Sequence, residues 1–98
     1  MAVKEVVVRT RPNTSVPFCR FKDVGLPVDH EAVAHDGVIS FDITYSEDGL
    51  TRTTTTTFRD EEARTSYNDN DVFKSAMRAL KQQDEGNNIT KTVTITEV

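Results

Sequence analysis

Two histidines and three carboxylates lie within the eight residues 29–36 and are the best metal candidate in the sequence. If this segment is helical, Glu31 and His35 are four residues apart and share a face, whereas His30 and His35 are separated by about 500° of rotation. Only two ligands then converge, and a stable transition-metal site usually has three or four. We therefore predict a solvated polar segment with no bound metal and no cofactor, in which Glu31 and His35 are the only weak metal candidates.

Asp42 is a candidate general base, because its alternating segment would place it on a face rich in hydroxyl groups. If another part of the molecule covers this face, loss of water makes the carboxylate a stronger base. Arg52 and Tyr45 would then be the candidate catalytic residues nearby. If the face instead meets water or the rim of a dimer, Asp42 only aids solubility, and we favour this second interpretation.

Threonine is unusually abundant and indicates where strands lie. Ten of the fourteen threonines fall in residues 51–57 and 90–96, and β-branched side chains favour strands over helices. Residues 38–45 alternate between apolar and polar side chains, which is typical of a half-buried strand. The sequence therefore predicts four strands, at residues 4–10, 38–45, about 50–58 and 89–98.

An Asp-Gly pair at residues 48–49 predicts a tight turn between the second and third strands. This pair suits the two positive-φ positions of a type I′ hairpin. Counting back from the turn places Tyr45 opposite Arg52 and Ile39 opposite Phe58. One face of the hairpin is then largely apolar, and the other carries mostly hydroxyl groups.

A helical stretch is predicted from about residue 61 onward. Asp60 suits the N-cap, and the two glutamates that follow it suit the first turn, where the helix dipole favours anions. Polar residues 68–71 predict a break, after which apolar side chains recur at helical spacing. We expect this stripe to pack on the sheet, so that the core consists of Ile39, Phe41, Ile43, Phe58, Val93 and Ile95 of the sheet with Phe73, Met77 and Leu80 of the helix.

These elements predict a single α+β domain over residues 1–98 with the ferredoxin-like βαββαβ order. It would have a four-stranded antiparallel sheet and one long helix in the C-terminal half. Residues 13–37 have no clean period, since Pro17, Gly25 and Pro27 interrupt them. A short helix near residues 28–34 is the expectation there.

The second half of the chain resembles the small dimeric α/β-barrel proteins related to antibiotic-biosynthesis monooxygenases. The resemblance lies in residues 58–63, which close a strand into a helix, and in residues 88–90, which open the last strand. It implies a homodimer and, in some relatives, cofactor-free oxygenase or haem-degrading activity. The chain departs from those relatives in having no tryptophan, and neither His30 nor His35 falls on a predicted core strand or on the long helix. It also resembles small uncharacterised bacteriophage proteins in size.

Composition argues against several classes of function and location. A net charge of -4 with scattered basic residues argues against nucleic-acid binding. No apolar run approaches the roughly 20 residues of a membrane span, and the N-terminus lacks the features of a signal peptide. A single cysteine, Cys19, fits a cytoplasmic protein.

The function that we favour from the sequence is a small non-enzymatic assembly or protein-binding module. It would be homodimeric and would bind through the threonine-rich face, with Thr53, Thr55 and Thr94 at the contact. The alternative is a small cofactor-free oxygenase or isomerase of the dimeric barrel type, with Asp42 as its base.

Overall fold

The computed structural model describes residues 1–18, 37–69 and 71–98, and of residues 71–73 it describes the backbone alone. The short helix predicted near residues 28–34 and the metal candidates Glu31 and His35 lie outside these residues. The described elements, in chain order, are β1 (Val3–Thr10), β2 (Val38–Tyr45), β3 (Thr51–Phe58), α1 (Glu61–Asn68), α2 (Asp71–Gly86) and β4 (Thr90–Glu97).

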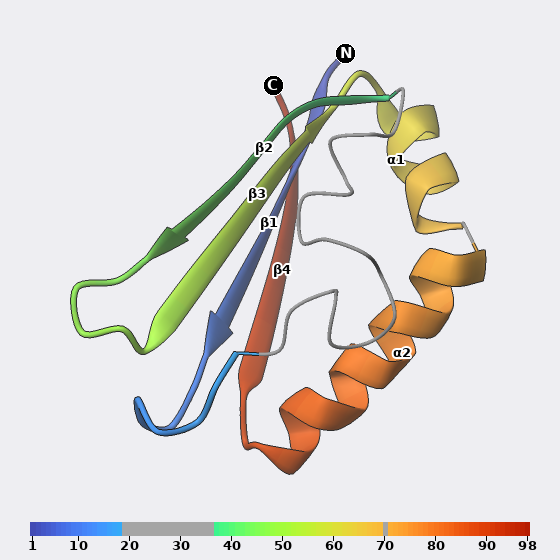
Figure 1. The fold of residues 1–98 in the computed structure, drawn as a ribbon. Coiled ribbons are helices and arrows are strands. Elements are labelled where there is room, and N and C mark those ends of the chain that lie inside the picture. Colours follow the sequence, from blue (N-terminus) through green and yellow to red (C-terminus); the bar gives the residue numbers. More distant parts are fainter. Residues whose placement is uncertain (19–36, 70) are drawn as a thin grey trace.

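The four strands form one antiparallel sheet in the order β2-β3-β1-β4. This order places β1 and β3 in the centre and β2 and β4 at the edges, which confirms the ferredoxin-like α+β prediction. Both helices lie on the same side of the sheet (Figure 1). The opposite face, which carries most of the threonines, is not covered by any element of the described residues.

The hairpin between β2 and β3 follows the predicted register from the turn as far as Phe41, and departs from it at the open end. Tyr45 lies opposite Arg52 as expected, but Val38 rather than Ile39 lies opposite Phe58, because a β-bulge shifts the register between residues 38 and 40. The bulge turns Ile39 outward, and 62% of its surface is exposed. The prediction that Ile39 belongs to the core is therefore wrong.

The turn that joins β2 to β3 is also not the predicted type I′ turn. Only Gly49 has a positive φ, of 75°, and the Gly49 amide donates to the Ser46 carbonyl at 3.0 Å. The Asp48 carboxylate accepts from the Leu50 amide and the Ser46 hydroxyl, which lowers its pKa. The connection is therefore a longer loop closed by its own side chains, in which glycine is needed at one position instead of two.

The helical stretch begins and breaks where the sequence predicts. The Asp60 carboxylate caps α1 by accepting from the Ala63 amide at 2.8 Å. α1 ends at Asn68 and the longer helix α2 begins at Asp71, which agrees with the predicted break. At the end of α2, Asn88 adopts a positive φ of 59° and the Ile89 amide donates to the Asp84 carbonyl at 2.8 Å, which directs the chain into β4.

A small apolar core lies between the sheet and the helices. Phe58 and Leu80 are the largest fully buried side chains, and the Phe58 ring packs on Tyr67 with the centroids 5.5 Å apart. Val93 and Ile95 were expected in this core, yet they are 44% and 46% exposed, because β4 is an edge strand with a neighbour on one side only. The other buried apolar side chains that the structure describes are Val3, Ala63, Ala76 and Ile89.

Candidate functional site

The helix-facing side of the sheet carries a row of basic and aromatic side chains at one end. Because directly opposed residues of neighbouring strands share a face, the registers place Tyr45, Arg52, Arg9 and Lys91 in a single line across β2, β3, β1 and β4. Arg9 contacts α2, so the whole line faces the helices. We call these four residues the basic rung. Like charges in opposed positions destabilise a sheet, so three cations on one rung need compensation from outside the sheet.

Asp84 of α2 supplies part of that compensation. Its Oδ2 accepts from Arg9 Nε at 3.2 Å, and both side chains are 7% exposed. The other carboxylate oxygen, Oδ1, is buried and has no hydrogen-bond partner among the described residues. A buried carboxylate oxygen without a donor is costly and is uncommon in folded proteins. Asp84 is therefore both the counter-ion of Arg9 and an acceptor available to a further proton donor.

Arg52 lies next to Arg9 on the rung, and its environment is aromatic. The residue is 6% exposed, and its guanidinium carbon lies 5.1 Å from the centroid of the Phe18 ring. The guanidinium carbon of Arg11 lies 4.7 Å from the same centroid, and the Tyr45 ring centroid is 6.3 Å from it. Cation–π contacts of this kind hold guanidinium groups in place.

Lys91 ends the rung at the edge strand. Partial burial and the neighbouring charge of Arg9 lower the pKa of its ammonium group, while Asp84 and Glu5 act in the opposite direction. The lowered pKa means that the charged form of Lys91 is less stable in the folded chain than it is in water. Among the described residues, Asp84 is the carboxylate for which an ion pair with the rung is established.

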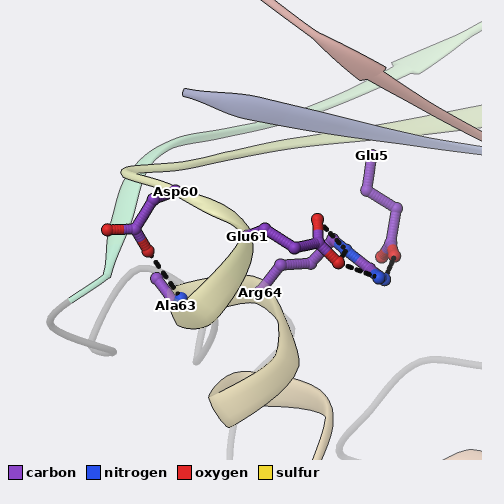
Figure 2. A network of polar contacts seen from close by, with 5 residues as sticks. All are labelled: Glu5, Asp60, Glu61, Ala63 and Arg64. Carbon is purple, nitrogen blue, oxygen red and sulfur yellow. Dashed lines mark hydrogen bonds and ion pairs between the residues drawn. The ribbon is translucent and has the colours of Figure 1, made fainter. Parts of the chain in front are cut away.

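A second polar network holds α1 against the sheet and has a structural role. Arg64 lies between two carboxylates: its Nη1 donates to Glu5 Oε1 at 3.3 Å and its Nε to Glu61 at 3.1 Å (Figure 2). The hydrogen bond from Arg64 lowers the pKa of Glu61, and Glu61 raises that of Arg64. All three charges of this network are paired, so the network anchors the helix on the sheet.

The predicted catalytic residues are divided between the two faces of the sheet. Arg52 and Tyr45 are neighbours on the basic rung, but Asp42 is exposed on the opposite face, where it lies across from Thr55. The structure therefore does not bring Asp42 together with the other two.

The predicted binding residues share the face of Asp42. Thr55 and Thr94 both lie opposite Val6 of β1, and Thr53 lies opposite Val8. That they form a contact surface stays a prediction. Among the described residues, which exclude the segment with Glu31 and His35, no group of three or more potential ligands could hold a metal ion.

Sequence reasoning missed Arg9, Asp84 and Lys91. Arg9 and Lys91 could have been found by placing the strands in the ferredoxin-like order. The residues opposite the candidate Arg52 on the neighbouring strands could then have been identified. Asp84 carries no comparable signal, because its approach to Arg9 depends on where the end of α2 lies over the sheet.

No protein-family model matches the chain, and no curated protein matches it in sequence. Solved structures do match in fold. A conserved Bacteroides thetaiotaomicron protein of unknown function, described as a possible oxidoreductase, has a TM-score of 0.75 at 11% identity, with 99% of this chain and 97% of that chain covered. SnoaB from Streptomyces nogalater, a cofactor-independent oxygenase, has a TM-score of 0.72 at 13% identity over 99% and 92% of the two chains.

A candidate antibiotic biosynthesis monooxygenase from Caulobacter crescentus has a TM-score of 0.70 at 16% identity, over 98% of this chain and 89% of that chain. The predicted resemblance to proteins related to antibiotic-biosynthesis monooxygenases is thus confirmed at the level of the fold. In the part of the chain that the structure describes, no helix is long and apolar enough to cross a membrane.

Proposed function

We propose that this chain is a small cofactor-free oxygenase or isomerase whose substrate is an enolisable phenol or ketone bound against the basic rung. The observation that carries the proposal is the row of three basic residues across the sheet, next to a buried carboxylate with one oxygen that has no hydrogen-bond partner among the described residues. Cations fixed by packing stabilise a negative charge that develops on a substrate oxygen, and they do so without reorganisation. The fold shared with a cofactor-independent oxygenase supports the same proposal.

The chemistry assigns a separate task to each group. Without a cofactor, the electrons that reduce oxygen must come from the substrate. Asp84 Oδ1 accepts a proton from a substrate CH2 group, and Arg9 and Arg52 stabilise the enolate that forms. The carbanion then adds to O2 and is protonated to a hydroperoxide, and loss of water from the hydroperoxide leaves a carbonyl. The balance is one CH2 group and one O2 giving one C=O group and one water. An isomerase would stop at the enolate and return the proton to another carbon.

The charge distribution favours this proposal over the non-enzymatic module that the sequence suggested first. A protein-binding surface on the outer face of the sheet gives no reason to hold three cations on the helix-facing side, where their mutual repulsion lowers stability. Self-association is compatible with both functions, and we propose that the chain acts as a homodimer in the cytoplasm.

The test measures oxygen uptake by the purified protein on a panel of polycyclic phenols with an adjacent CH2 group, without added flavin and with a metal chelator present. We expect turnover, a loss of roughly 10²- to 10⁴-fold in kcat for Asp84→Asn, and a raised KM for Arg52→Met. Arg59→Met is the matched control, because the Arg59 side chain is 63% exposed and lies outside the rung. Absence of both oxygen uptake and substrate isomerisation across the panel, or full activity in folded Asp84→Asn protein, would refute the proposal.

A further inference from the structure

Lys91 is a basic side chain that the proposed mechanism does not use. It is the second residue of β4, where this edge strand leaves the end of α2 (Figure 1). The residue is exposed, so small molecules in solution can reach its amine. Among the described residues no carboxylate forms an ion pair with Lys91, whereas Lys74 on the surface of α2 pairs with Asp69 at 3.3 Å.

The immediate surroundings of Lys91 favour its neutral amine form. Arg9, which is 6% exposed, lies directly opposite it on β1. Val93 lies two residues further along the strand, so its apolar side chain shares the face of Lys91. Partial burial and then the charge of Arg9 lower the pKa of Lys91. A neutral lysine amine next to another cation is a nucleophile toward carbonyl carbons.

Four charged groups act on this amine, and they are Arg9 and Glu5 of β1 with Asp84 and Lys81 of α2. The two basic groups favour the neutral amine, and the two carboxylates oppose it. Each carboxylate already has a closer cation, because Asp84 pairs with Arg9 at 3.2 Å and Glu5 pairs with an arginine of α1 at 3.3 Å. The balance at Lys91 therefore remains on the side of the neutral form.

We propose that Lys91 condenses with β-dicarbonyl compounds to form an enaminone. The amine nitrogen bonds to one carbonyl carbon, and the oxygen of that carbonyl leaves as water with one proton from the nitrogen and one from the central CH2 group. No electrons are transferred, so no oxidant or cofactor enters the balance. The inference does not rest on the proposed oxygenase or isomerase activity, because the condensation needs neither oxygen nor turnover.

Arg9 determines which carbonyl compounds fit best. A monoketone gives an imine whose nitrogen is basic, and its protonated form places a second cation opposite the Arg9 guanidinium. Like charges in opposed positions of a sheet are destabilising. A β-dicarbonyl compound gives a conjugated enaminone, which is neutral and avoids this repulsion. The charge on β1 therefore favours the dicarbonyl class over simple ketones.

Acetylacetone is the probe that tests the proposal. The enaminone absorbs in the near ultraviolet, and it adds the mass of the probe less one water. Peptide mapping after brief exposure near neutral pH locates the adducts, and Lys91 should react at least about tenfold faster than Lys74 of the same molecule. The rate at Lys91 should also reach its plateau at a lower pH than the rate at Lys74, because a lowered pKa frees the amine at a lower pH.

Lys91→Arg is the matched variant, since it keeps a positive charge on β4 and removes the primary amine. It should lose the fast adduct and leave the labelling of Lys74 unchanged, and circular dichroism confirms that it is folded. With methyl propyl ketone trapped by borohydride, the preference for Lys91 over Lys74 should be smaller than with acetylacetone.

The proposal is overturned if Lys91 reacts with acetylacetone no faster than Lys74, or if the fast adduct survives in Lys91→Arg. An equal preference for Lys91 with the monoketone would overturn the choice of the β-dicarbonyl class. None of these measurements involves oxygen uptake. A failure of this proposal is therefore distinguishable from a failure of the proposed function.

Discussion

Replacing Asp84 with leucine removes the carboxylate that forms an ion pair with Arg9 and leaves Arg9 buried between two other basic residues. The geometry sets the scale of the effect. Two unit charges 3.2 Å apart attract by about 5 kcal/mol at an effective dielectric constant of about 20, and removing one partner of a buried pair typically costs about 3–5 kcal/mol. We expect Asp84→Leu to lie near the upper end of this range, because Arg52 and Lys91 flank Arg9 on the neighbouring strands.

The companion variant Arg9→Met should cost less, near the lower end of the same range, since Lys91 remains close to the carboxylate that is left. The double variant Arg9→Met/Asp84→Leu should lose less than either single variant, because it leaves no uncompensated charge of the pair. Urea unfolding followed by circular dichroism measures all three. For a slope of about 2 kcal/mol per M, a loss of about 4 kcal/mol lowers the midpoint by about 2 M.

The matched control is Asp69→Leu, since Asp69 pairs with Lys74 at 3.3 Å on the surface, where the two side chains are 66% and 53% exposed. Its loss should stay below about 1 kcal/mol. If Asp84→Leu costs no more than this control, or if the double variant costs the sum of the two single variants, then the Arg9–Asp84 pair is not the buried, isolated interaction described above.

Three further predictions concern the core, the helix cap and the acidic segment before β2. Leu80→Ala should lower the free energy of unfolding by about 2–5 kcal/mol, because Leu80 is 2% exposed and its truncation leaves a cavity; chemical denaturation measures this, and a loss below about 0.5 kcal/mol would contradict the packing. The backbone amide at the start of α1 lowers the pKa of Asp60 below its ordinary value of 3.8, so the stability from this cap is complete above about pH 4 and is lost as the pH falls through the lowered value. Between pH 6 and pH 2, the melting temperature of the wild type should fall by more than that of Asp60→Asn. Identical pH profiles for the two proteins would contradict the cap. Zinc should not bind stoichiometrically in a calorimetric titration, whereas tight one-to-one binding abolished by His35→Ala would contradict the absence of a metal site.

Local signals in the sequence predicted the fold well because they depend on neighbouring residues. Asp60 caps a helix because its side chain reaches an amide three residues ahead, and the alternation in residues 38–45 sets the strand that the structure contains. The edge position of β4 and the bulge at Ile39 are different in kind. They depend on which strands lie beside each other, and for that reason Ile39, Val93 and Ile95 were wrongly assigned to the core.

The candidate site was harder to predict than the fold. Each member of the basic rung comes from a different strand, and residues as distant as Arg9 and Lys91 become neighbours only through the pairing of the first and last strands. Arg52 and Tyr45 could be paired by counting from one turn. Asp42 was chosen for its hydroxyl-rich surroundings, and the same alternation that identified its strand placed it on the face away from Arg52.

The bulge in β2 also limits how large an assembly can become. Strand pairing between copies can continue without end if both edges of a sheet accept a partner, and it stops at two subunits if only one edge does. The irregular register at residues 38–40 interrupts the ladder of β2, so that a third copy would meet a broken row of backbone groups there. A chain with one regular and one interrupted edge offers its regular edge alone as a continuous template for strand pairing, which opposes growth into fibrils.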